Sequence, residues 1–309
     1  MPFLYDDKPD KPKEKQVHAR LNNCTLIGAL QTSPYVVKDE DTDELRMATA
    51  RIWVCRSSRD NTRQEKTVVY EPVSIASNDP VIVKEMSTWK TGDAVQVFGP
   101  VSTKKAVKSC NCPNCYHTNY KNGIMTYILP STAYCVRRLG DFDLAKGFIS
   151  QLHNQMENSN RAIGVGTLLK EPAFRIETYG KHMVQFPIKI TRKFYNSLDD
   201  PSERADFPYV KAYDETADYN FAKLKQYSVI LYDGFLQTRL VKRWDICEAC
   251  AERFSWSDQV LEIVPYENSI EYLSGERDEA ETKRILKEKD LNNGSRDKWL
   301  TLESDIFNR

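Results

Sequence analysis

The sequence predicts a mainly β protein made of two consecutive five-stranded barrels, and three observations support this prediction. The chain contains one internal repeat, its strands alternate apolar and polar residues, and each copy of the repeat holds a short helical segment at the same place. A chain of 309 residues is long enough for two domains of ordinary size. A helical connector between the copies and a charged helix after the second copy complete the expected fold.

The repeat is clearest in a segment that aligns without gaps. Residues 95–115 (VQVFGPVSTKKAVKSCNCPNC) align with residues 230–250 (ILYDGFLQTRLVKRWDICEAC), so that Gly99 matches Gly234 and one CxxC pair matches another. A CxxC pair alone is common, but one inside a gap-free match of this length indicates a duplication. From the extent of the copies we expect a flexible arm over 1–17, a first barrel over 18–139, a connector over 140–158, a second barrel over 159–274 and a charged helical tail over 275–309.

Alternation with period two indicates the strands. In residues 51–55 (RIWVC), Ile52 and Val54 are expected to point into the barrel while Trp53 points outward. The segments DPVIVKEMSTWK in the first copy and DYNFAKLKQY in the second predict a short helix between the third and fourth strands. Five strands with a helix at this place are typical of the OB-fold.

The first copy also resembles a known family. Residues 81–104 (VIVKEMSTWKTGDAVQVFGPVSTK) are similar to the helix and the following strand of bacterial single-stranded DNA-binding proteins (SSB), and residues 22–36 (NNCTLIGALQTSPYV) resemble their opening strand. The resemblance covers most of the first copy and, more weakly, the second. The two-copy arrangement is similar to the longer forms found on mobile elements, although the usual single-copy proteins lack the CxxC insertion.

Residues 1–16 contain no apolar segment typical of a signal peptide, which predicts a cytoplasmic protein. The resemblance implies that the protein coats single-stranded DNA during replication, recombination or conjugative transfer. It also implies a homodimer that would bring four OB-folds together. The alternative is an OB-fold module that binds RNA or another protein. An enzyme is not expected, because the sequence contains no P-loop, no Gly-x-Ser-x-Gly motif and no His-Glu-x-x-His motif.

The charge balance limits where nucleic acid can bind. The 44 Lys and Arg residues are matched by 44 Asp and Glu residues, so a phosphate-binding surface must be a local patch. Single strands are held by cations along the phosphates and by aromatic rings stacked on the bases. Two basic hairpins that correspond in the repeat, together with the outward positions of neighbouring strands, predict DNA contacts at Arg51, Trp53, Arg56, Lys104, Lys105, Lys108, Lys189, Arg192, Phe194, Tyr195, Arg239, Lys242, Arg243 and Trp244.

Each of these positions also has a structural interpretation. Trp53 either stacks on a base or packs across the strands, Trp244 either stacks or covers a metal-binding loop, and the lysines can form an ordinary solvated face.

The eight cysteines suggest a structural metal, with zinc the expected ion. Two arrangements satisfy four ligands. In the first, Cys112, Cys115, Cys247 and Cys250 meet across the pseudo-twofold axis that relates the copies; in the second, Cys110, Cys112, Cys115 and His117 close a loop within the first copy. A chain without metal is the third possibility. Cys24, Cys55 and Cys135 are expected to be buried core thiols.

Overall fold

The computed structural model describes residues 21–57, 68–152, 159–176, 181–192 and 205–292. The first half contains β1 (Asn22–Leu30), β2 (Tyr35–Lys38), β3 (Leu45–Ser57), β4 (Val68–Ser77), α1 (Pro80–Ser87), β5 (Asp93–Gly99), β6 (Val101–Asn111), β7 (Thr118–Ile128) and β8 (Thr132–Arg138). The helix α2 (Phe142–Ser150) follows. The second half contains β9 (Asn160–Leu168), β10 (Ala173–Ile176), β11 (His182–Thr191), β12 (Ala205–Asp206), β13 (Tyr209–Tyr213), α4 (Asp214–Lys223), β14 (Val229–Ile246), β15 (Arg253–Ser274) and α5 (Glu279–Asn292).

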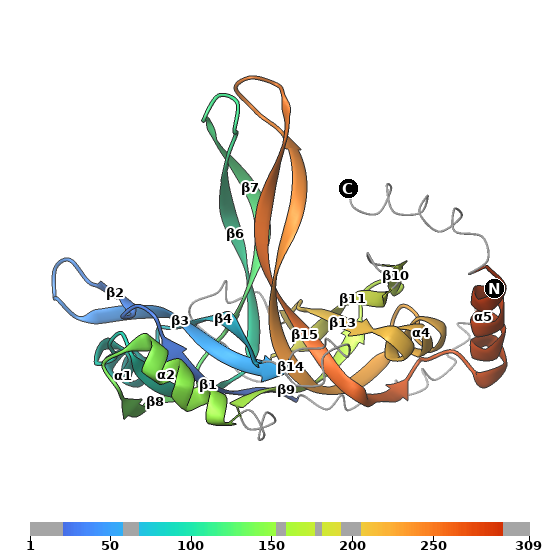
Figure 1. The fold of residues 1–309 in the computed structure, drawn as a ribbon, viewed down its shortest axis with the longest axis horizontal. Coiled ribbons are helices and arrows are strands. Elements are labelled where there is room, and N and C mark those ends of the chain that lie inside the picture. Colours follow the sequence, from blue (N-terminus) through green and yellow to red (C-terminus); the bar gives the residue numbers. More distant parts are fainter. Residues whose placement is uncertain (1–20, 58–67, 153–158, 177–180, 193–204, 293–309) are drawn as a thin grey trace, which may run out of the picture.

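The protein is mainly β, as the alternation predicts (Figure 1). The helix α1 begins at an aspartate cap, because the Asp79 carboxylate accepts hydrogen bonds from the amides of Val81 and Ile82. The helices α2 and α5 lie in the segments where the sequence predicts a connector helix and a tail helix. None of the described helices is long and apolar enough to cross a membrane.

The strand pairing of the first half is repeated in the second. β1 pairs with β3 and β5, and β9 pairs with β11 and β14, all antiparallel. The registers correspond as well, since Leu30 lies opposite Ile52 and Leu168 lies opposite Ile188. The other pairing of each first strand also corresponds, since Gly99 lies opposite Cys24 in β1 and Gly234 lies opposite Ala162 in β9. The structural repeat therefore follows the sequence repeat residue by residue.

The two halves form one continuous sheet. β1 and β9 pair antiparallel with Cys24 opposite Ala162, so that the pseudo-twofold axis passes close to this pair. Two equivalent asparagines lie on either side of it. The Asn22 side chain exchanges hydrogen bonds of 2.8 and 3.0 Å with the backbone of Val101, and Asn160 does the same with Leu236 at 3.0 Å. These bonds satisfy buried backbone groups that the sheet leaves unpaired.

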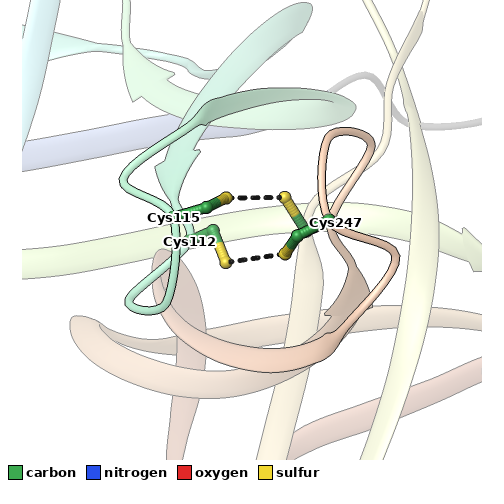
Figure 2. A group of neighbouring side chains, drawn as sticks. Cys112, Cys115 and Cys247 are labelled. Carbon is green, nitrogen blue, oxygen red and sulfur yellow. Dashed lines mark hydrogen bonds between the residues drawn. The ribbon is translucent and has the colours of Figure 1, made fainter.

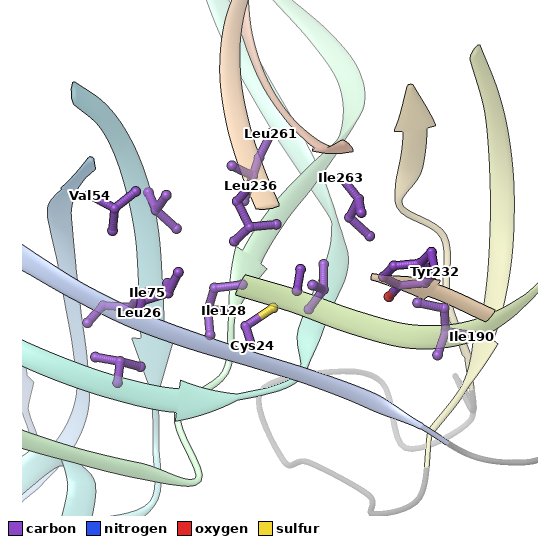
Figure 3. Packing of buried hydrophobic residues seen from close by; sticks show 14 of the residues in the cluster. Cys24, Leu26, Val54, Ile75, Ile128, Ile190, Tyr232, Leu236, Leu261 and Ile263 are labelled. Atoms are coloured by element: carbon purple, nitrogen blue, oxygen red, sulfur yellow. The ribbon is translucent and has the colours of Figure 1, made fainter. Parts of the chain in front are cut away.

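A single apolar core runs through both halves (Figure 3). It includes Ile52 and Val54, whose side chains are fully buried, so the predicted inward face of β3 is confirmed. Trp89, at the end of α1, is also in this core. A smaller cluster forms where Ala145 and Ile149 of α2 pack on the other face of the sheet.

Two long β-hairpins project from the body of the molecule side by side (Figure 1). The first is formed by β6 and β7, and the second by the outer parts of β14 and β15. We call residues 103–126 and the equivalent residues 238–261 together the stalk. The CxxC pairs lie in the turns at its tip.

Candidate metal centre and nucleic-acid surface on the stalk

The two hairpins of the stalk contact each other through their inner faces, and three of these contacts are ion pairs. Lys108 of the first hairpin lies 2.5 Å from Asp258 of the second, and the Asp258 carboxylate also accepts a hydrogen bond of 2.8 Å from Arg243. Nearer the tip, Lys121 lies 3.2 Å from Asp245 and 3.3 Å from Glu248. Basic side chains of the predicted DNA-binding set are thus used inside the stalk.

The tip consists of two turns with the same backbone geometry. In the first, the Cys112 amide donates to the carbonyl of His117, and the Tyr116 amide donates to the carbonyl of Cys112, each at 2.9 Å. In the second turn, Cys247 makes the corresponding two bonds at 2.9 Å with Glu252 and Ala251. Both turns contain a non-glycine residue at a φ of 59°. This shared conformation brings both thiols of each turn toward the opposite hairpin.

The four thiols of the two CxxC pairs converge (Figure 2). The Sγ atoms of Cys115 and Cys247 are 3.5 Å apart, those of Cys112 and Cys250 are 3.8 Å apart, and all four lie within 4.8 Å of one another. Zinc bound tetrahedrally by sulfur at about 2.3 Å places the sulfur atoms roughly 3.8 Å apart. The cluster therefore fits a structural metal site shared by the two halves.

The arrangement within the first copy is not formed. Among the residues that the structure describes, the thiol group at the tip includes neither Cys110 nor His117. Cys110 is buried and its thiol points to the carbonyl of Asn119 at 3.8 Å, because the β-strand alternation directs it to the inner face of the hairpin. Cys24 and Cys55 are buried, as expected, whereas Cys135 is half-buried.

Asn119 supports the cluster from the first hairpin, a role that no motif in the sequence predicts. Its fully buried amide lies 3.7 Å from the Cys247 thiol, and its Oδ1 accepts a 2.9 Å hydrogen bond from the Glu248 amide. The only signal in the sequence is a break in the repeat, since the equivalent residue is Phe254.

The four thiols do not titrate alike. Desolvation raises the pKa of Cys247, but hydrogen bonds from the amides of Cys250 and Ala249 and from the Asn119 side chain lower it more, to about 6. Cys250 shows the opposite result. The Glu252 amide lowers the pKa of Cys250, yet desolvation and the neighbouring thiols raise it to about 12. One thiolate is therefore available near neutral pH before any metal binds.

The outer faces of the stalk differ in composition from its inner faces. Cross-strand partners point to the same side of a hairpin, so the registers define each outer face. On the first hairpin this face carries Lys105, Val107, Ser109, Tyr120, Asn122 and Ile124; on the second it carries Leu240, Lys242, Trp244, Ile246, Arg253, Ser255, Ser257 and Gln259. None of these positions is acidic, although the chain as a whole is neutral.

Large apolar side chains on these outer faces are open to solvent. The exposed fraction is 56% for Trp244, 64% for Tyr120 and 68% for Leu240. The Trp244 ring has two cations beside it, with the Lys242 ammonium 4.9 Å and the Arg253 guanidinium 5.1 Å from the ring centroid. An exposed indole flanked by two cations suits a flat anionic ligand.

Two predicted DNA contacts lie instead in buried ion pairs. Arg192 pairs with Asp206 at 2.8 Å, and the two side chains are 7% and 1% exposed. Asp206 also accepts a 2.7 Å hydrogen bond from the amide of Thr103 in the other half. The pseudo-equivalent pair, Arg56 with Glu71, is 2.6 Å long and binds the Thr238 amide in the same way. Burial beside a carboxylate removes both guanidinium groups from the surface that DNA can reach.

The other predicted residues are dispersed. Arg239 pairs with Glu262 at 3.1 Å, and the Lys104 ammonium lies 5.6 Å from the Tyr127 ring centroid. Trp53 is half-buried, with its ring edge-on to Phe142 of α2 at 6.1 Å, whereas Arg51 and Lys189 are exposed. Phe194 and Tyr195 lie outside the described residues.

No family model and no curated protein matches the sequence. Solved structures do match. The wild-type single-stranded DNA-binding protein of Thermus aquaticus is 16% identical, with a TM-score of 0.51 over 84% of this chain and 97% of that chain. A deletion mutant of the same protein is 15% identical, with a TM-score of 0.52 and the same coverage. The chain has the fold of these proteins. A Plasmodium falciparum SSB in complex with single-stranded DNA is 20% identical, covering 39% of this chain and 98% of that chain, with a TM-score of 0.30.

Proposed function

We propose that this protein binds single-stranded DNA without catalysing a reaction, and that the outer faces of the stalk are part of its binding surface. The observation that carries the proposal is the separation of charge on the stalk. On the strands of the stalk, the inner faces hold Asp245 and Asp258, each beside a cation, whereas the outer faces combine cations with exposed aromatic and aliphatic side chains and contain no acid.

This composition matches the two requirements of single-strand binding. Lys105, Lys242 and Arg253 would contact phosphates, and Trp244 and Tyr120 would stack on bases, which tolerates any sequence because every base has a π-face. Exposed Arg51 and Lys189 would add phosphate contacts on the body. The fold shared with the Thermus aquaticus protein, named as a single-stranded DNA-binding protein, supports the same function.

The finer architecture belongs to the same proposal. Each half would be one OB-fold, over residues 18–139 and 159–274, and two chains would associate to bring four OB-folds together. The repeated strand registers support the first statement. Coating of single strands during replication, recombination or transfer of a mobile element would be the cellular role.

Zinc is the ion that best suits the four cysteines at the tip. A site of four thiolates favours zinc over the hard cations calcium and magnesium, which prefer oxygen ligands. With all four positions filled by protein, no place is left for a reacting water, so the role of the ion would be structural.

A direct test measures the anisotropy of a labelled oligo-dT of about 35 nucleotides, with a duplex and an RNA of equal length in parallel. The proposal predicts tight binding of the DNA single strand that weakens with salt, and weak binding of the duplex. The double variant Lys242→Gln with Trp244→Ala should weaken it, whereas Lys84→Gln, on the exposed side of α1, should not. Equal affinity for RNA would favour the RNA-binding alternative, and absence of any complex would refute the proposal.

A further inference from the structure

The tip of the stalk has little apolar packing of its own. Its buried cluster consists of Cys110, Cys112, Cys247 and Phe254, with Cys250 and Trp256 at the edge, and it is separate from the main core. Most of these groups are cysteines. A cluster this small buries too little apolar surface to hold two long hairpins together.

The ionic contacts below the tip add little. Of the ion pairs that join the two hairpins, Lys121 and Asp245 each keep about a quarter of their side-chain surface in solvent, and Lys108, paired with Asp258, keeps 21%. Ion pairs that remain open to water are weakened by screening and by the ordering of long side chains. A metal ion bound by thiolates from both hairpins would be a far stronger connection.

The thiols are divided equally between the two halves of the chain. Each half supplies one CxxC pair, and the closest contacts, between Cys115 and Cys247 and between Cys112 and Cys250, cross from one hairpin to the other. Asn119 adds a third cross-hairpin contact to the same turn through the Glu248 amide. An ion at this place therefore joins residues more than 130 positions apart in the sequence.

The cluster is directly connected to the Trp244 site. Ile246 and Arg253 are the last pair of the second hairpin before its CxxC turn, and the Arg253 guanidinium lies beside the Trp244 ring. The turn is closed by the hydrogen bond from the Cys247 amide to the Glu252 carbonyl. Arg253 directly follows Glu252, so an ordered turn also fixes the position of Arg253.

We propose that the metal ion at the stalk tip clamps the two hairpins together and that its occupancy controls the affinity for single-stranded DNA. This inference rests on the proposed function. A DNA single strand that spans the outer faces of both hairpins binds more tightly when the hairpins are held in one orientation, because the hairpins are then already ordered before the DNA binds. Loss of the ion should weaken binding by about tenfold, because the two hairpins must then be ordered as the DNA binds.

The experiment uses the full chain in three forms, kept under a phosphine reductant so that no disulfide forms. They are zinc-loaded, stripped with a zinc chelator and dialysed, and reloaded with zinc(II). Bound zinc is measured by atomic emission, and oligo-dT affinity by anisotropy. Cys247→Ser removes a ligand, and Cys135→Ser is the matched control, since Cys135 is half-buried and outside the cluster.

The clamp predicts one zinc per chain, binding about tenfold weaker in the stripped protein and in Cys247→Ser, and recovery on reloading of the stripped wild type. Stripped and loaded protein with equal affinity would refute the clamp and leave the proposed function intact. A chain that retains no zinc would refute it as well. Failure of the zinc-loaded protein to bind oligo-dT would instead refute the proposed function. The stripping experiment needs no substitution, so a poorly folded variant does not prevent the test.

Discussion

Replacement of Arg192 by methionine distinguishes a phosphate contact from a buried link between the two halves. In the structure, the guanidinium donates to Asp206 at 2.8 and 2.9 Å and to the carbonyl of Thr103 at 3.1 Å. Methionine keeps much of the side-chain length and removes all of these bonds. The Asp206 carboxylate, whose side chain is 1% exposed, then retains the Thr103 amide as a hydrogen-bond donor but loses its cation.

The expected cost follows from this burial. Breaking a buried ion pair by removing one partner costs about 3–5 kcal/mol, because a charge is left without compensation. The remaining bond to the Thr103 amide offsets part of this, so we expect the free energy of unfolding to fall by about 2–4 kcal/mol. By contrast, removing a phosphate contact would leave the stability nearly unchanged. It would reduce the slope of log affinity against log salt by about 0.7.

Urea unfolding and salt titration of oligo-dT binding measure these two quantities on the same protein. Lys189→Met is the matched control, since Lys189 is an exposed cation on β11, the strand that Arg192 directly follows. We expect Arg192→Met to lower stability with an unchanged salt slope, and Lys189→Met to lower the slope with unchanged stability. A stable Arg192→Met with a reduced slope would refute the assignment of Arg192 to the link between the halves.

Three further predictions concern the stalk and Gly234 of β14. Trp244→Ala should weaken oligo-dT binding by about 1–3 kcal/mol, roughly 5- to 150-fold, because one base loses its stacking partner; unchanged affinity in the anisotropy assay would remove Trp244 from the binding surface. Zinc affinity, measured by chelator competition between pH 5 and 8, should fall as the pH falls, because protons compete with zinc for the thiolates. The fall should be steepest below about pH 6, where the Cys247 thiol is also protonated. A zinc affinity independent of pH would contradict thiolate ligation. Gly234→Ala should lower the free energy of unfolding by at least about 1 kcal/mol, because its Cβ would lie 2.2 Å from the carbonyl oxygen of Val264; a urea midpoint equal to wild type would show that the strand adjusts.

Local patterns in the sequence were sufficient for much of the fold. The alternation in β3 placed Ile52 and Val54 correctly in the core, since neighbouring side chains of a strand must point to opposite faces. The gap-free repeat predicted that Gly99 and Gly234 would be equivalent, and both oppose residues of equivalent first strands. The match of two CxxC pairs favoured the four cysteines that the structure brings together, although it left the first-copy arrangement open.

Which of the predicted cations face solvent depends on contacts between segments far apart in the chain, and local sequence patterns do not reveal these contacts. A run of basic residues on two hairpins shows that cations are present, but not which of them meet acids of the other hairpin. Lys108 and Asp258 are 150 residues apart, and only the pairing of the hairpins reveals that they neutralise each other. Asn119 was missed for the same reason, because its role depends on an amide 129 residues away.

The sequence by itself determined the inward face of β3 and the duplication, and it favoured the four cysteines that the structure brings together, because each of these follows from spacing along one strand or from a match between two segments. Tertiary structure alone decided which cations are free to meet an anionic ligand. Arg56 and Arg192 lie in the same kind of pattern as Arg51 and Lys189, yet the first two are buried against carboxylates at the junction of the halves. The physical reason is that burial and charge compensation depend on contacts between distant segments, which the pseudo-twofold packing of the two halves creates.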